Sequence, residues 1–206
     1  MARVSQEHLD ARRRQILDGA ALCFARNGFH ATSMQDVLKE VGLSAGAVYR
    51  YFSGKEELIG AIVGEVLREL RETFEAAGRE TPPPPPDVLV GRAFGQVLDL
   101  KPGLRDGDRP YFPRLIVQVW TETLRNPELR EVMQSGYDRV RAAWVGIVEG
   151  YQAAGMIRDD VPADHVARTM IAAAQGFVAQ IALFDDVPVE ALQQGLRGLM
   201  SMAGPR

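Results

Sequence analysis

Apolar residues recur every three or four positions along almost the whole chain, and the strict alternation typical of strands is nearly absent. Leu17, Ala20 and Phe24, for example, fall on one face of a helix that Gly28 would end, because glycine readily takes the left-handed cap conformation. Hydrophobic residues make up 46% of the 206, enough to bury a core. The pattern predicts an all-α protein of about nine helices.

Capping residues set the boundaries of the first helices. The second helix is predicted to begin at Thr32 or Ser33, where Thr32-x-x-Gln35 fits a capping box, and Ser53-x-x-Glu56 fits another at the start of a long fourth helix. Ser44 is a favourable N-cap between them. The segment before Ser53 therefore reads helix, glycine-containing turn, short helix, which is the arrangement of a helix-turn-helix.

The short helix in the stretch GLSAGAVYRYF, residues 42 to 52, is thin. Small side chains over its first turn would let the backbone approach DNA bases and phosphates closely. Gly46 weakens a helix by about 1 kcal/mol relative to alanine. A local preference lost without a gain in the core indicates a surface that fits a partner, and a helix-turn-helix lays this helix in the major groove. Hydrogen-bond donors follow at Tyr49, Arg50 and Tyr51.

Two features of this N-terminal part have two interpretations each. Tyr49 either faces outward or packs in the core of a helical bundle, whereas Phe52 is predicted to be core. Arg12, Arg13 and Arg14 form either a solvated face or a contact for an anionic partner, and the N-terminal part as a whole is only mildly basic.

Residues 16 to 63 resemble the DNA-binding segment of the TetR family of bacterial transcriptional regulators. The resemblance is carried by A-x-x-x-F-x-x-x-G-F, V-G-L-S-x-G-x-V-Y and Y-F-x-x-K-E-x-L, in order and at fixed spacing. The segment from residue 16 to residue 63 covers about a quarter of the chain. The family often has histidine directly before the phenylalanine of the Y-F pair, where this chain has Tyr51, whose phenol can still donate to a phosphate.

The resemblance implies a helix-turn-helix DNA-binding domain at residues 1–56. A long fourth helix joins it to a helical ligand-binding and dimerisation domain at residues 57–206. The implied phosphate contacts are Thr32 or Ser33, Tyr49, Tyr51 and Lys55. The implied base contacts are Ser44, Ala45, Gly46 and Arg50. Arg50 suits a guanine because its guanidinium fork matches O6 and N7, and the cluster at Arg12, Arg13 and Arg14 would reach the backbone or the minor groove.

Prolines and glycines divide the chain after residue 57. TPPPPP at 81–86 ends the fourth helix, because proline lacks an N–H group, and favours a stiff loop. KPGLRDGDRP at 101–110 is a further break. Pro127 suits the first position of the helix after it.

Aromatic side chains at helical spacing after residue 57 are most simply interpreted as core residues. Together with nearby polar residues they also suit the wall of an apolar cavity, and TetR regulators typically use such a cavity to sense an effector. The candidate ligand residues are Phe94, Gln96, Gln118, Trp120, Thr123, Tyr137, Trp144, Gln175 and Phe177. The identity of the small molecule stays open.

Small and apolar residues form stripes along the last two predicted helices, about 163–184 and 189–202. Such smooth faces let helices pack closely, either within one chain or against a second copy as a four-helix bundle. The TetR resemblance favours a homodimer, whose two recognition helices would read a palindromic operator in double-stranded DNA. The candidate interface residues are Ala172, Gly176, Ala179, Leu183, Ala191, Leu192, Gly195, Gly198, Leu199 and Met202.

Nothing in the sequence indicates an enzyme, a metal or a cofactor. His8, His30 and His165 stand apart, and the sequence has neither Cys/His metal-ligand spacing nor a phosphate-binding loop of the Gly-x-x-x-x-Gly-Lys type. The single Cys23 falls in an apolar stripe and is predicted to be a core residue in a reducing compartment.

The expected location is the cytoplasm, without a membrane. No secretory segment is visible, and the most apolar later run, about 15 residues, is shorter than the roughly 20 that a bilayer span needs. A sequence-specific DNA-binding regulator, most simply a repressor released by a ligand, fits these features. The alternative is a helical adaptor that binds a ligand or a protein and does not bind DNA.

Overall fold

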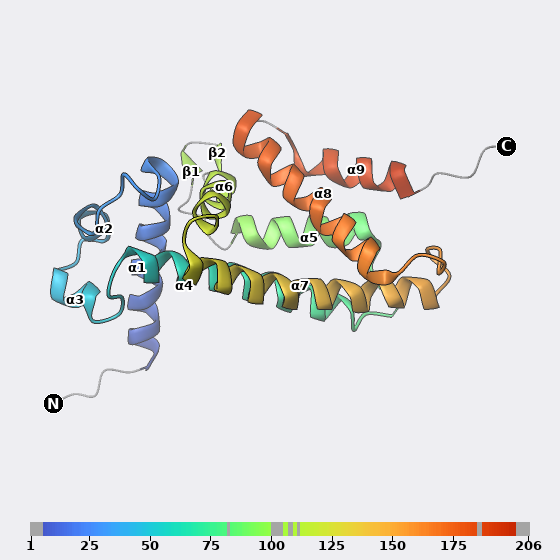
Figure 1. Cartoon of the computed structure of the whole chain (residues 1–206), viewed down its shortest axis with the longest axis horizontal. Helices are drawn as coiled ribbons and strands as arrows, with labels where there is room; N and C mark the ends of the chain where they lie inside the picture. Colours follow the sequence, from blue (N-terminus) through green and yellow to red (C-terminus); the bar gives the residue numbers. More distant parts are fainter. Residues whose placement is uncertain are drawn as a thin grey trace. The chain divides into compact units, whose positions relative to one another are not determined.

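The computed structural model describes residues 6–81, 83–99, 105–106, 109–110, 112–184 and 187–200 (Figure 1). Nine helices lie within these ranges, and the all-α prediction is confirmed. They are α1 (Gln6–Asn27), α2 (Met34–Val41), α3 (Ala45–Tyr49), α4 (Lys55–Ala77), α5 (Pro86–Asp99), α6 (Phe112–Thr123), α7 (Pro127–Ala153), α8 (Ala163–Phe184) and α9 (Val189–Met200).

The predicted break at residues 101–110 holds a short antiparallel pair, β1 (Arg105–Asp106) with β2 (Arg109–Pro110). The sequence predicts a break here but no strand. Two paired residues on each side are too few to show alternation in a sequence. After the break, α7 begins at Pro127 as predicted, and the Asn126 side chain caps it by accepting from the Leu129 N–H at 3.0 Å.

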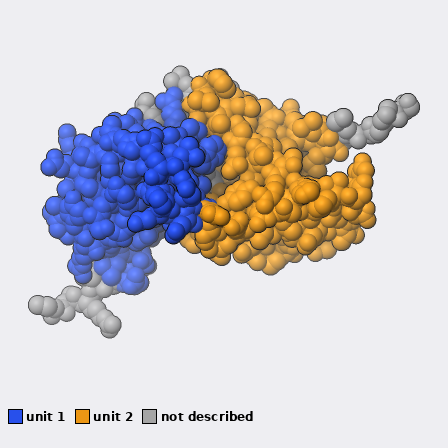
Figure 2. Space-filling model, viewed as in Figure 1, with its two compact units in different colours: residues 1–65, 101–133 blue, residues 66–100, 134–206 orange. Residues whose placement is uncertain are grey.

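The chain divides into two compact units, which Figure 2 colours separately. Unit 1 holds residues 1–65 and 101–133, and unit 2 holds residues 66–100 and 134–206. Both α4 and α7 contribute residues to each unit. α6 belongs to unit 1 together with α1, α2 and α3. A functional division at residue 56 remains a prediction, because compact units are defined by packing and not by role.

Helix α1 packs against α2 and α6 within unit 1. Its buried face carries Leu17, Ala20 and Phe24, the stripe predicted from the sequence. After the last residue of α1, Gly28 takes φ 88°, and the Phe29 ring folds back to 5.3 Å from the Phe24 ring. The left-handed glycine therefore turns the chain directly into the core.

The capping residues of α2 and α4 differ from the predicted ones. Ser33, not Thr32, is the N-cap of α2, because its hydroxyl accepts from the Asp36 N–H at 3.2 Å and the Asp36 carboxylate accepts from the Ser33 N–H at 2.8 Å. Before α4, the Ser53 N–H donates to the Glu57 carboxylate at 2.7 Å, whereas the sequence predicts Glu56 as its partner. In each case two neighbouring residues fit the same local motif, so the motif alone does not decide between them.

The core of unit 2 gathers side chains from α4, α5, α7, α8 and α9. The Trp144 ring is buried 4.9 Å from the Phe74 ring. Tyr151 is also buried, and its hydroxyl donates to the Pro84 carbonyl. Burial raises the pKa of Tyr151, so this hydroxyl stays protonated and keeps its donor. Pro84 is thereby fixed to α7.

Helices α5 and α9 approach each other closely in unit 2. Arg197 donates to the buried Asp87 carboxylate at 2.6 Å, and the Gln193 amide donates to the Asp87 carbonyl at 3.2 Å. Gly91 permits this approach, because a Cβ there would lie 2.1 Å from the Gln193 amide nitrogen. A charged pair and a glycine thus fix the last helix to α5.

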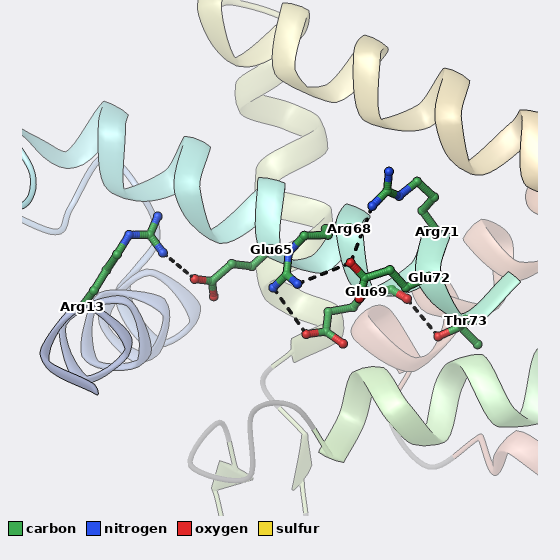
Figure 3. A network of polar contacts seen from close by, with 7 residues as sticks. All are labelled: Arg13, Glu65, Arg68, Glu69, Arg71, Glu72 and Thr73. Atoms are coloured by element: carbon green, nitrogen blue, oxygen red, sulfur yellow. Dashed lines mark hydrogen bonds and ion pairs between the residues drawn. The ribbon is translucent and has the colours of Figure 1, made fainter. Parts of the chain in front are cut away.

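Ion pairs line α4 within unit 2 (Figure 3). Arg68 lies 3.6 Å from Glu69 and 3.5 Å from Glu72, and Arg71 lies 3.5 Å from Glu72. All four side chains are a third to a half exposed. Pairs of this kind contribute about 0.2–1 kcal/mol each, so burial of the opposite face of α4 contributes more to stability.

Gly136 of α7 marks a close approach to α4 in unit 2, since a Cβ there would lie 2.3 Å from Cδ1 and 3.1 Å from Cβ of Leu67. Gly146, on the same helix, faces open space. We expect Gly136→Ala to lower the free energy of unfolding by about 1–3 kcal/mol through overpacking. Gly146→Ala should raise it by up to about 1 kcal/mol through helix propensity. Urea unfolding followed by circular dichroism compares the two, and equal effects would contradict this packing.

Candidate nucleic-acid interface

Buried side chains on one face of helix α3 fix the helix within unit 1. Val48 and Phe52 are buried in unit 1, as predicted for Phe52. At the start of the helix the Ser44 hydroxyl accepts from the Ala47 N–H at 3.4 Å, which confirms Ser44 as the N-cap. A helix of five residues is thereby fixed with little side-chain bulk.

The outer face of α3 is open to solvent. The four predicted base contacts are all exposed: Ser44, Ala45, Gly46 and Arg50. A Cβ added at Gly46 would meet no atom within 4 Å, so packing inside the chain does not require this glycine. Tyr49 is 48% exposed, which excludes the core interpretation, and Tyr51 is half-buried. The small residues on this face of α3 therefore have no packing role within the described part of unit 1.

Of the two candidate phosphate contacts at the start of α2, only Ser33 is exposed. Thr32 is buried, and its hydroxyl lies 2.7 Å from the Gly28 carbonyl oxygen and 3.2 Å from that of Cys23. Thr32 therefore fixes the end of α1. Ser33 is the exposed member of the pair, and its hydroxyl donates to the Asp36 carboxylate at 2.6 Å.

Lys55 joins the start of α4 to the turn between α1 and α2. Its ammonium donates to the carbonyl oxygens of Phe29 at 2.9 Å and Thr32 at 3.1 Å, and it lies 4.7 Å from the centroid of the Phe29 ring. An ammonium has three donors. The residue predicted as a phosphate contact thus has a structural role as well, with one donor left for DNA.

The arginine cluster divides between structure and surface. Arg13 binds Glu65 at 2.8 Å (Figure 3), and its guanidinium lies 5.4 Å from the centroid of the Phe52 ring. Arg12 donates to a glutamine on the same helix at 2.8 Å, and Arg14 is exposed. Arg13 therefore stabilises unit 1 behind α3, while DNA contacts by Arg12 and Arg14 remain predictions.

Two ionised carboxylates lie at the starts of α2 and α4. Side-chain and backbone hydrogen bonds from Ser33 hold the pKa of Asp36 below its usual range. The backbone and side-chain bonds from Ser53 lower the pKa of Glu57 in the same way. Both helix starts therefore carry a negative charge at neutral pH beside the predicted phosphate contacts.

Cys23 is buried between α1 and α2, as its apolar stripe predicts. Its Sγ lies 3.8 Å from the Asp36 carbonyl oxygen. Burial, reinforced by the negative charges of Glu40 and Asp36, raises the pKa of the Cys23 thiol to about 11. The thiol is therefore neutral and poorly reactive at physiological pH.

The predicted ligand residues fall in both units. Those on α6 in unit 1 are Gln118, Trp120 and Thr123. The Gln118 side-chain oxygen would lie 3.7 Å from a Cβ at Gly28, so this residue meets the turn after α1. Thr123 donates to the Val119 carbonyl at 2.7 Å. Gln118 thus relates α6 to the turn after α1, whereas the Thr123 bond lies within α6 itself.

The other six predicted ligand residues lie in unit 2. The Phe94 and Phe177 rings meet edge to face at 5.4 Å, and Tyr137 and Trp144 pack in or against the core. Gln96 accepts from the Thr73 hydroxyl, and Gln175 is exposed. Core packing accounts for the aromatic contacts, and ligand binding by this set remains a prediction.

The predicted dimer residues lie mainly on exposed surface of α8 and α9. Leu183 is 66% and Leu199 is 68% exposed. The exposed small residues are Ala172, Gly176, Ala191, Gly195 and Gly198. Ala179 is half-buried, and Leu192 packs against the core of unit 2. Met202 lies outside the described residues.

Two buried carboxylates, Asp87 and Glu122, carry no sequence motif. Glu122 shares the buried face of α6 with Leu115 and Val119, and its carboxylate lies 2.9 Å from the His30 ring. A charged residue in an apolar stripe is a signal that periodicity alone passes over.

Comparison with known proteins places the chain in a family. Residues 16–62 match the model of bacterial regulatory proteins of the tetR family, and residues 103–201 match the model described as BetI-type transcriptional repressor, C-terminal. An uncharacterized HTH-type transcriptional regulator of Bacillus subtilis (strain 168), YfiR, is 30% identical over 189 residues, 89% of this chain and 86% of its own. The chain belongs to the TetR family.

Further relatives agree with the TetR assignment. The HTH-type transcriptional repressor Rv1474c of Mycobacterium tuberculosis is 31% identical over 186 residues, 90% of each chain. The structure of Salmonella enterica GusR has a TM-score of 0.69 at 27% identity and covers 98% of this chain and 100% of its own. This TetR-family protein is therefore a DNA-binding transcriptional regulator and not an enzyme.

Lys55 of this TetR-family protein should contribute to stability independently of DNA. We expect Lys55→Met to lower the free energy of unfolding by about 1.5–3 kcal/mol, since hydrogen bonds from charged groups contribute about that much. Lys39→Met, at an exposed position of α2, is the matched control and should change it by less than about 0.5 kcal/mol. Urea unfolding measures both, and two equally stable variants would show that the bonds of Lys55 to the turn contribute nothing.

Proposed function

We propose that this protein binds a palindromic operator as a homodimer, represses transcription there and leaves the DNA when a small molecule binds its C-terminal part. The outer face of α3 carries the proposal, because it combines a bulk-free first turn with the exposed Arg50 and serves no packing within the described residues. A helix this short reads few bases. Two copies on a dyad would read half-sites one DNA turn, about 34–36 Å, or more apart.

Each residue at this face has a chemical role in the proposed complex. Arg50 would pair with guanine O6 and N7, and the first turn of α3 would let the backbone approach neighbouring base edges. The proposed phosphate ligands are Ser33, Tyr49, Tyr51 and the remaining donor of Lys55. Arg12 and Arg14 of α1 would contact the flanking backbone or minor groove.

The apolar surface of α8 and α9 supports the homodimer. An 18-residue window of α8 has a mean hydropathy of 1.3, enough by length and composition to cross a membrane, yet only 28% of it is buried. A second copy that packs its own α8 and α9 against these helices would bury that surface in a four-helix bundle. The hydropathy of α8 then requires no bilayer, and we place the regulator in the cytoplasm.

Release by an effector is supported by the α4 helix, which supplies residues to both units. A ligand that favours one arrangement of α4 would change the separation of the two recognition helices. A tenfold loss of operator affinity needs a differential binding of only about 1.4 kcal/mol. Repression as the mode of action is supported by the relative from M. tuberculosis, which is named a repressor.

Selection of duplexes from a randomised DNA pool by the purified protein tests the proposal. The selected duplex is then titrated at two salt concentrations. Enrichment of a palindrome, with an affinity that falls steeply as salt rises, would show two sets of phosphate contacts releasing counterions. Weak and uniform binding to all duplexes would contradict operator recognition and favour a helical adaptor.

Arg50→Ala should weaken binding to the selected duplex by about 1–3 kcal/mol, or about 5- to 150-fold, and relax the preference at one base position of each half-site. Stability should stay within about 0.5 kcal/mol, because the side chain is exposed. Arg139→Ala, which removes an exposed arginine from unit 2, is the matched control and should bind normally. Fluorescence anisotropy with the duplex decides, and unchanged affinity in Arg50→Ala would remove Arg50 from the interface.

Leu199→Glu should dissociate the homodimer, since it places a charge in the proposed apolar interface. Leu124→Glu introduces the same charge at another exposed leucine, 76% exposed at the end of α6, and should leave the dimer intact. Analytical ultracentrifugation at one protein concentration compares both with the wild type. A dimer that persists in Leu199→Glu would exclude α9 as the interface.

A further inference from the structure

Glu122 is a carboxylate in an apolar position. It lies on the buried face of α6 with Leu115 and Val119, and its side chain is 8% exposed. One carboxylate oxygen lies 2.9 Å from Nε2 of His30 and 3.9 Å from Nε of Arg125. Burial of a carboxylate is costly unless a partner charge compensates it. His30, whose side chain is 62% exposed, is the nearer of these two partners.

His30 lies in the turn that leads into α2, three residues before the N-cap Ser33. Its ring meets the Phe29 ring edge-on at 5.6 Å, and the Phe29 carbonyl accepts from Lys55. Through Glu122, α6 thus holds the same turn that Lys55 holds from α4. The position of this turn sets the start of α2, where the proposed phosphate contact lies.

A second residue of α6 meets this turn and makes the contact tight. Gln118, one helical turn before Glu122, has a buried side-chain oxygen without a hydrogen-bond partner in the described part of the chain. A Cβ at Gly28 would lie 3.7 Å from that oxygen, and Gly28 has φ 88°. Two residues of α6, Gln118 and Glu122, thus lie near the turn between α1 and α2.

Histidine is the side chain that gains or loses its charge between about pH 5 and 8. When His30 is protonated, the pair is an ion pair at hydrogen-bond distance. When His30 is neutral, Glu122 retains at most a neutral hydrogen bond to it and the more distant Arg125. Loss of the proton therefore weakens the link between α6 and the turn.

The other charged groups around this turn come from three helices. Lys55 of α4 lies against the Phe29 ring, and Arg26 at the end of α1 lies 3.5 Å from Glu40 of α2. Lysine and arginine side chains keep their charge over the range in which histidine titrates. Histidine differs from both in this respect, because its charge depends on the proton concentration near neutral pH.

We propose that the His30–Glu122 pair is a proton-dependent clamp between α6 and the α1–α2 turn, and that a charged His30 strengthens operator binding. Both are positioning residues, because they act by holding the turn ahead of Ser33. The inference rests on the operator binding proposed above. It adds a second input, proton concentration, to a regulator otherwise controlled by its effector.

The test is the affinity of the full chain for the selected duplex, measured by fluorescence anisotropy from about pH 5.5 to 8.5 at fixed ionic strength. Glu122→Gln removes the buried charge at nearly constant volume and leaves His30 intact. His30→Gln is neutral at every pH. His8→Gln and His165→Gln remove the other two histidines of the chain and serve as matched controls.

We expect the wild-type affinity to fall about fivefold or more between pH 6 and 8, the lower end of usual coupling between sites. Both control variants should follow the wild type, whereas Glu122→Gln and His30→Gln should be nearly independent of pH. Full wild-type pH dependence in Glu122→Gln would overturn the clamp, since the charge of His30 alone would then explain the effect. A flat wild-type curve would also overturn it.

Two further outcomes separate the clamp from its assumptions. Absence of binding to any duplex at any pH would overturn operator recognition and the clamp with it. If Glu122→Gln does not fold, His30→Lys decides instead, because it keeps a positive charge at an exposed position throughout the range. Binding by His30→Lys at pH 8 as tight as that of the wild type at pH 6 supports the clamp, and weaker binding overturns it.

Discussion

Burial of Val48 and Phe52 in unit 1 is what allows a recognition helix of five residues to exist. An isolated helix needs about 12–15 residues to be even marginally stable in water, and Gly46 weakens α3 further. The conformation of α3 therefore comes from the core behind it and from the Ser44 cap. Its outer face is not needed for packing, so small residues there can allow a close approach to DNA.

The turn between α1 and α2 is the second point on which unit 1 depends. Lys55 reaches it from the start of α4, Glu122 reaches it from α6, and Thr32 closes it from within. Each contact uses a backbone carbonyl or a charged partner, so the turn is held by directional bonds rather than by apolar packing alone. A shift of either α4 or α6 would therefore move the start of α2.

Local signals in the sequence predict the helices and the outline of the DNA-binding face. Glycine and proline have strong local preferences, so Gly28 and Pro127 mark helix boundaries correctly, and small residues mark the exposed face of α3. The cap of α2 is missed by one residue because neighbouring side chains fit the same motif. Local signals cannot predict the contact between His30 and Glu122 or the bonds from Lys55 to backbone carbonyls, because the partners come from distant parts of the chain.

The outer face of α3 is the surface at which we propose that DNA binds. Amide hydrogen exchange of the full chain, with and without the selected duplex, measures this directly. We predict that DNA slows exchange in peptides covering residues 33–36 and 44–51 and leaves α9 unchanged, since α9 lies in unit 2. Slowed exchange elsewhere, with residues 44–51 unchanged by bound DNA, would contradict the account.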